Sequence, residues 1–154
     1  MFFSDEVFFE KFKAIMEHDT KTHRYRFHGT TCLDDAKSIC EHGLGVMRRD
    51  LDSTTYTELT MEQVIVHERG FGGEIGRDAY IIIDEPRGEK ILEPYDGNLK
   101  IVGSGLQGLE VEARNMVRSK YIVGYVDKLN RDIIFNPEYY DYERFSQFVS
   151  KKSV

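Results

Sequence analysis

The stretch that decides the fold is residues 24–44, RYRFHGTTCLDDAKSICEHGL. Its first part has aromatic residues at alternate positions, which is typical of a strand, and it ends in His28-Gly29-Thr30. The second part has apolar residues at helical spacing and ends at Gly43, where a left-handed C-cap belongs. We therefore predict a strand that ends in His-Gly-Thr and turns directly into a short helix.

Two interpretations of His28 remain open from the residues alone. A histidine at a strand end can contact a small ligand, and Gly29 lets a ligand approach the backbone closely. The same pattern is equally typical of a strand-end histidine beside a turn glycine. At the start of the helix, Asp34 or Asp35 is expected to accept hydrogen bonds from the first free N–H groups.

The composition predicts one globular domain over residues 1–154, with 40% hydrophobic and 31% charged residues. No apolar run approaches the roughly 20 residues that span a bilayer, so we expect no membrane partner. The N-terminus lacks the pattern of a signal peptide, and Cys32 and Cys40 flank the same short helix. This favours a reducing, cytoplasmic location. The net charge of −6 disfavours nonspecific binding to nucleic-acid backbone.

The remaining chain predicts more strands than helices. Residues 79–84, AYIIID, form the strongest strand, since they are β-branched and suited to burial on both faces. Further strands are expected at 89–92, 99–102, 108–113, 120–126 and 131–135, and further helices at 4–18, 58–69 and 137–150. Because strands and helices do not alternate, the predicted class is α+β with a mostly antiparallel sheet system.

Two further groups of residues could carry chemistry. Glu110 and Glu112 alternate with apolar residues, so both carboxylates project to one side of the predicted strand. If that side of the strand faces solvent, the two glutamates are ordinary surface residues. If it lines a cleft, their carboxylates could stabilise a cationic transition state. Ser53 and Tyr56 lie in a hydroxyl-rich stretch that could contact a planar ligand, although an ordinary loop with a helix cap has the same composition. No metal site is predicted, because the histidines and cysteines lack zinc-site spacing.

Taken together, these pieces resemble the ADP-ribosyltransferase superfamily, which includes poly(ADP-ribose) polymerases, mono-ADP-ribosyltransferase toxins and RNA 2′-phosphotransferases. Residues 27–44 look like the first strand and helix of that family. Residues 110–112 and 119–123 look like its glutamate strand and the strand that follows. Tyr56 is similar in position to the nicotinamide-stacking tyrosine. The resemblance covers roughly residues 24–126 and depends on the order of the pieces.

The resemblance implies a split β-sandwich with NAD, as substrate, in the cleft between the sheets. His28 would bind a ribose hydroxyl, Gly29 would meet the nicotinamide amide through its backbone, and Tyr56 would stack on the nicotinamide. Thr30 and Ser53 complete the expected NAD-binding set. A glutamate would hold the ribose and stabilise the oxocarbenium-like transition state as nicotinamide leaves.

Both glutamates are candidates for that role. The toxin pattern, in which the second of two spaced glutamates is catalytic, favours Glu112, whereas shorter His-Gly-Thr proteins favour Glu110. The toxins with paired glutamates usually carry arginine where this chain has His28. The chain therefore mixes features of two branches, and the acceptor is not defined by the resemblance.

The resulting hypothesis is a cytoplasmic bacterial or phage ADP-ribosyltransferase that modifies a macromolecule, by preference a protein. Two alternatives stay open. One is a binding module that uses the same cleft for a nucleotide or partner without transfer. The other is an NAD-dependent RNA 2′-phosphotransferase, against which the acidic net charge counts mildly.

Overall fold

Two antiparallel sheets and one helix make up the described part of the chain. The computed structural model describes residues 14, 17, 20–30, 32–46, 56–57, 79–95, 115–127, 130 and 132–143. The large sheet has the order β3 (Tyr56–Thr57), β1 (His23–Thr30), β4 (Ala79–Pro86), β7 (Ile122–Asp127) and β8 (Asp132–Phe135). The small sheet has the order β2 (Leu44–Val46), β6 (Asn115–Val117) and β5 (Leu92–Pro94).

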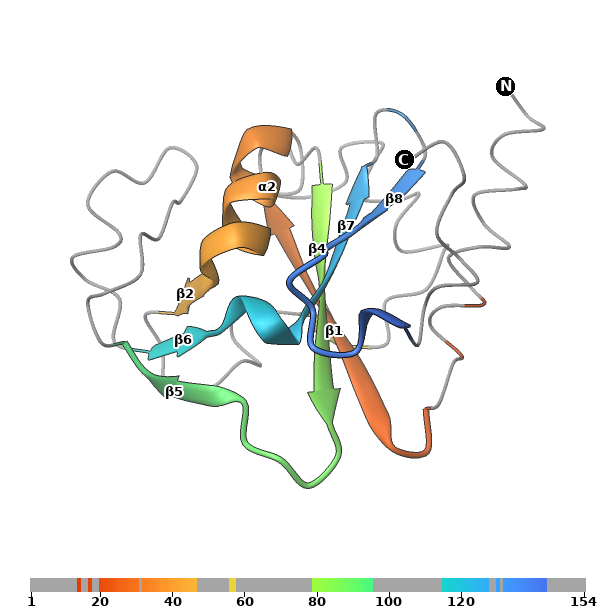
Figure 1. The fold of residues 1–154 in the computed structure, drawn as a ribbon, viewed down its shortest axis with the longest axis vertical. Coiled ribbons are helices and arrows are strands. Elements are labelled where there is room, and N and C mark those ends of the chain that lie inside the picture. The colour runs from red at the N-terminus through yellow and green to blue at the C-terminus, as the bar shows by residue number, and fades with distance from the viewer. Residues whose placement is uncertain are drawn as a thin grey trace.

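The α+β class and the antiparallel sheet system are confirmed, because every strand pairing in the described residues is antiparallel. Figure 1 shows β1, β4, β7 and β8 running together, with α2 (Leu33–His42) and the small sheet to one side of them. A short 3₁₀ helix, η2 (Ser119–Tyr121), joins β6 to β7. The chain therefore passes between the two sheets three times in this part of the structure, through α2, through the turn between β4 and β5, and through η2.

The pairing of β1 with β4 determines which face each side chain of β1 occupies. His28 lies opposite Ile81, and Thr30 lies opposite Ala79. Residues directly opposite each other in an antiparallel pair project to the same face of the sheet. His28 and Thr30 therefore share the face of Ile81 and Ala79, whereas the alternate residues of β1 project to the other face.

The main core lies on the face of the large sheet that carries Ile81. Its buried side chains come from α2, both sheets and the segment before β5: Ala36, Ile39, Cys40, Leu44, Val46, Ala79, Ile81, Ile83, Ile91, Val117, Ile122 and Tyr125. Burial of this much apolar surface, at roughly 25 cal/mol per Å², is the main force that holds α2 and the small sheet against the large sheet. β4 is buried on both faces from Ala79 to Asp84. This confirms the strand predicted at 79–84, which extends to Pro86.

The predicted strand–helix unit is confirmed, with a correction at each end of the helix. β1 ends at Thr30, and α2 begins at Leu33. Gly43 ends the helix as predicted and donates its N–H to the carbonyl of Ile39. Its φ of +100° is positive, but its ψ of 173° is extended, so the cap does not have the predicted left-handed helical conformation. The predicted cap by Asp34 or Asp35 is wrong. The N-cap residue is Cys32, which makes no side-chain cap hydrogen bond, and both aspartates lie within the first turn.

Several boundaries also differ from the predictions. The strand expected at 89–92 is found at 92–94, because the chain first turns at Arg87 and Gly88. The strand expected at 120–126 begins at Ile122, after η2. β8 lies within the range expected for it, whereas β2 and β6 were not predicted. The predictions at 4–18, 58–69, 99–102 and 108–113 lie almost wholly outside the described residues.

The helix predicted to begin at Pro137 is wrong for its first residues, which form turns. Asn136 is buried, and its side-chain amide donates to the carbonyls of Ser119 and Ile122. Its side-chain oxygen accepts the N–H of Glu138, and its own carbonyl accepts the N–H of Tyr139. The two local bonds satisfy polar groups of the turn, and the two long-range bonds to Ser119 and Ile122 hold Asn136 in a conformation that competes with a helix.

Gly124 lies at an irregularity in the centre of the large sheet. The register between β4 and β7 shifts between Ile82 and Ile83, as in a β-bulge. Gly124 adopts φ +154°, and a Cβ at this position would lie 2.0 Å from the carbonyl oxygen of Ile134. The close approach of β8 to β7 therefore requires glycine at this position.

We expect Gly124→Ala to lower the free energy of unfolding by about 3 kcal/mol or more, because the methyl group meets rigid backbone. Urea denaturation measures the loss. Gly88→Ala is the matched control, since Gly88 has φ +87° but nothing lies within 4 Å of a Cβ there. The control should lose only about 1 kcal/mol from backbone strain. Equal losses in the two variants would contradict a packing role for Gly124.

Candidate functional site

The last three residues of β1 form the described part of the site expected from the sequence. The side chains of His28 and Thr30 share the core face of the large sheet, on which α2 and the small sheet pack. Thr30 is buried, and His28 is partly buried. Gly29 follows His28 on the opposite face and lies opposite Tyr80 of β4. The strand end therefore places a histidine and a hydroxyl on the side of the sheet that packs against α2 and the small sheet.

Of the other predicted site residues, Tyr56 is described through its backbone alone. Tyr56 pairs with Phe27, directly before His28, and this pairing makes β3 the neighbour of β1. Strand pairing thus brings together Phe27 and Tyr56, which are 29 residues apart in the sequence. Ser53, Glu110 and Glu112 lie outside the described residues. Their roles stay predictions.

The two cysteines differ in their suitability for chemistry. Both are free thiols; Cys32 is partly exposed, whereas Cys40 is buried in the core between α2 and β7. Burial, assisted by the negative charge of Glu41, raises the pKa of Cys40 to about 12. Since the thiolate is the reactive form, burial makes Cys40 a poor nucleophile, and its side chain packs in the core. Burial also raises the pKa of Tyr125, with further contributions from Cys40, Asp127 and Asp132.

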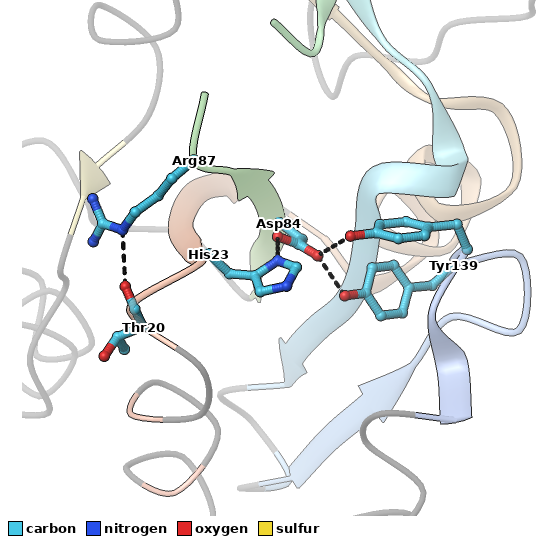
Figure 2. A network of polar contacts seen from close by, with 6 residues as sticks. Thr20, His23, Asp84, Arg87 and Tyr139 are labelled. Atoms are coloured by element: carbon cyan, nitrogen blue, oxygen red, sulfur yellow. Dashed lines mark hydrogen bonds and ion pairs between the residues drawn. The ribbon is translucent and has the colours of Figure 1, made fainter. Parts of the chain in front are cut away.

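A second polar cluster, centred on Asp84, lies on the opposite face of the large sheet. Asp84 is fully buried on β4. Its Oδ1 lies 2.7 Å from Nδ1 of His23, and its Oδ2 accepts hydrogen bonds from the hydroxyls of Tyr139 at 2.5 Å and Tyr140 at 3.0 Å. Figure 2 shows the imidazole of His23, from β1, and the phenol of Tyr139, from the turn after β8, both directed at the carboxylate of Asp84. A buried carboxylate is retained at acceptable cost only with such donors.

The geometry of the Asp84 cluster indicates that its main role is structural. A carboxylate only accepts hydrogen bonds, so Nδ1 of His23 must be the donor. The ring planes of Tyr139 and Tyr140 meet edge to face at a centroid distance of 5.0 Å. Nearby, Arg87 donates to the carbonyl of Thr20 at 2.8 Å, which ties the segment before β1 to the turn after β4. Together these contacts join the two ends of the described chain to one end of the sheet.

The residue pattern alone does not predict the Asp84 cluster. Its members lie far apart in the sequence. At least 55 residues separate Asp84 from the two tyrosines, and 61 separate His23 from Asp84. One signal was present, because an aspartate directly following a run of buried isoleucines must find donors once the strand is covered on both faces. Nothing in the sequence identified which donors they would be.

No zinc-like cluster of three or more histidine, cysteine or acidic side chains occurs within the described residues. The same part of the chain contains no helix that is long and apolar enough to cross a membrane. A scan against protein-family models, and searches among curated proteins and solved structures, found no match to this chain. Inferences about function therefore depend on the residues and their geometry.

We expect Tyr139→Phe to lower the free energy of unfolding by about 2 kcal/mol, because it removes a donor from a fully buried carboxylate. Tyr140→Phe is the matched variant, since it removes the same kind of donor from the same oxygen. Tyr140 is 48% exposed, so water can replace its hydroxyl and the expected loss is under about 1 kcal/mol. Chemical denaturation measures the free energy of unfolding of both variants. Equal decreases would show that the buried hydrogen bond from Tyr139 to Asp84 contributes no more than the exposed one from Tyr140.

We expect Cys40 to resist alkylation by iodoacetamide in the folded protein at pH 8, whereas Cys32 reacts. With a pKa of about 12, the Cys40 thiolate is roughly one part in ten thousand at that pH. The reactive fraction rises as the pH increases towards the pKa, so the difference between the cysteines should narrow in alkaline solution. Peptide mass spectrometry after timed labelling measures both rates, with urea-unfolded protein as the control. Equal rates in the folded protein would show that Cys40 is accessible.

Proposed function

We propose that the chain is an NAD-dependent ADP-ribosyltransferase with a split β-sandwich fold, acting in the cytoplasm on a macromolecular acceptor, by preference a protein. The observation that carries this proposal is the position of His28 and Thr30. Both lie at the end of β1, on the face that packs against α2 and the small sheet. A ligand held between the two sheets would meet these side chains, as the resemblance to the superfamily requires.

Two neighbouring features bear on this site. β3 brings the backbone of Tyr56 opposite Phe27, and Phe27 projects to the face opposite to that of His28. The proposed stacking of Tyr56 on nicotinamide therefore follows from the resemblance and not from this pairing. β6 begins at Asn115, three residues after Glu112, and lies between β2 and β5 in the small sheet. The proposed glutamates thus directly precede the central strand of the sheet that faces the core from the other side.

The proposed reaction breaks the bond between nicotinamide and C1′ of its ribose. The bonding electron pair leaves with nicotinamide and neutralises its ring, while positive charge develops on the ribose. Glu112, with Glu110 as the other candidate, stabilises this charge as a preorganised anion. A nucleophile of the acceptor then bonds to C1′ and gives its proton to a carboxylate or to water. With water as nucleophile, the products are free ADP-ribose and nicotinamide.

The proposed cofactor-site residues act by binding and orientation. His28 holds a ribose hydroxyl, the Gly29 backbone holds the nicotinamide amide, and Tyr56 stacks on the ring. Thr30 and Ser53 contribute hydroxyls to the same NAD-binding set. Orientation of this kind accounts for a large part of catalysis because it removes the entropy of alignment before the bond breaks.

We expect the wild-type protein to bind NAD and release nicotinamide, and Glu112→Gln or Glu110→Gln to reduce release by at least about a hundredfold. Calorimetry measures NAD binding, and chromatography measures nicotinamide. His28→Ala should instead weaken NAD binding, because it removes a proposed ribose contact. Glu89→Gln is the matched control, since Glu89 is exposed in the turn after β4 and has no proposed contact with NAD.

The two measurements separate the possible functions. Binding with loss of release in a glutamate variant supports transfer. Binding without release in the wild-type protein would indicate a binding module. Release that depends on a 2′-phosphorylated RNA, with loss of that phosphate, would indicate RNA 2′-phosphotransfer. A wild-type protein that neither binds NAD nor releases nicotinamide would contradict the proposal.

A further inference from the structure

Tyr140 is a large aromatic side chain that lies at the surface, on the turn segment that follows β8. It is 48% exposed, and in the described part of the chain Ile134 is the other large apolar side chain that is exposed. Tyrosine is enriched among the residues that dominate binding energies at protein interfaces, because its ring supplies a large contact area with few rotatable bonds. Tyr140 is therefore a candidate for contact with a partner.

Contacts on several sides hold the Tyr140 side chain in place. Its hydroxyl donates to Oδ2 of Asp84 at 3.0 Å, and its backbone N–H donates to the carbonyl of Lys120 at 2.9 Å. Its ring meets the rings of Tyr139 and Tyr121 edge to face, at centroid distances of 5.0 Å and 5.8 Å. A side chain that is already ordered loses little entropy when a partner binds, so the exposed ring is preorganised for contact.

Acidic residues flank Tyr140 in the sequence. Glu138 and Glu143 are exposed, and Asp141 is partly exposed. Within the part of the chain that the structure describes, neither Glu138 nor Glu143 forms an ion pair. All three carboxyl groups belong to residues within three positions of Tyr140, so their negative potential reaches its ring with limited screening by salt. The surface around the ring therefore favours a cationic group.

The neighbouring tyrosine shows how a cation is accommodated in this cluster of rings. Nζ of Lys120 lies 5.1 Å from the centroid of the Tyr121 ring, which is the distance of a cation–π interaction. The electron-rich face of a tyrosine attracts a guanidinium in the same way, and arginine makes such contacts more often than lysine because its planar group also stacks. The ring of Tyr140 is the more exposed of the two, so it can receive a cation from another molecule.

We propose that the ring of Tyr140 and the carboxylates of Glu138 and Glu143 form a docking surface for a basic, arginine-bearing segment of a partner protein. A guanidinium of the partner stacks on the exposed ring, and the two carboxylates pair with it or with the basic side chains beside it. A nucleic acid does not fit this surface, because the same carboxylates repel its phosphates. The inference goes beyond the proposed function, since it involves neither NAD nor the side chains proposed to bind it.

The test titrates the full chain with a short synthetic peptide of alternating glycine and arginine. A second peptide carries citrulline in place of arginine, because citrulline has nearly the same shape and no charge. Calorimetry at low ionic strength measures both dissociation constants. We expect the arginine peptide to bind at least about tenfold more tightly than the citrulline peptide, since only the guanidinium offers a charge to the ring and the carboxylates.

Variants of the protein locate the binding. Tyr140→Leu should weaken binding of the arginine peptide by about threefold, whereas Tyr140→Phe keeps the ring and should stay within about twofold of the wild type. Glu138→Gln combined with Glu143→Gln should weaken binding by about fivefold. Asp34→Asn is the control and should leave the affinity unchanged. Asp34 is an exposed acidic residue in the first turn of α2, which follows the end of β1 opposite to the end near Asp84.

Weakening by the Tyr140→Leu and double glutamate variants, with Tyr140→Phe and Asp34→Asn close to the wild type, supports the proposal. Equal affinities for the two peptides, no binding of the arginine peptide, or an equal effect of Asp34→Asn and the double glutamate variant would each overturn it. If Tyr140→Leu does not fold, the double glutamate variant decides, because it changes only exposed side chains. Binding of a short single-stranded RNA that is lost in Tyr140→Leu would indicate a nucleic-acid surface and would also overturn the proposal.

Discussion

The eight-residue antiparallel pairing of β1 with β4 is the constraint on which the rest of the structure depends. Because side chains alternate between faces, this single register assigns His28 and Thr30 to the core side and His23 to the side of Asp84. A slip by one residue would exchange every assignment. The register is held by the burial of β4 on both faces, since a shifted strand would lose apolar contacts on both sides at once.

The Asp84 cluster reinforces that register from the far side of the sheet. Asp84 is a buried carboxylate with three hydrogen-bond donors. Loss of any one donor would leave a carboxylate oxygen without water or a full set of partners, so arrangements that displace a donor are disfavoured. The donors come from β1 and from the turns after β8, so the cluster requires both to be in place. Asn136 has a matching role where η2 meets β7, because its side-chain amide donates to the carbonyls of Ser119 and Ile122.

Asp84 and Asp35 are two buried aspartates that differ in their hydrogen bonding. Both are buried aspartates, but one accepts hydrogen bonds from three side chains while the other has a buried oxygen that accepts none within the described residues. Three donors offset the cost of burying Asp84, whereas Asp35 lies in the first turn of α2, where the helix dipole favours an acidic residue. That distinction depends on partners, and two aspartates of one sequence do not differ in any local property that reveals it.

Local chemistry in the sequence determined the α+β class, the strand at 79–84, the strand ending in His-Gly-Thr, and the helix with its cap at Gly43. Periodicity and glycine conformation act over a few residues, which is why these predictions are confirmed. Tertiary contacts decided the rest: the turn at 137, where Asn136 bonds to distant carbonyls, the partners of Asp84, and the face that His28 shares with α2. These features depend on which distant strands pair, and a residue pattern within one segment contains no information about its partner in another.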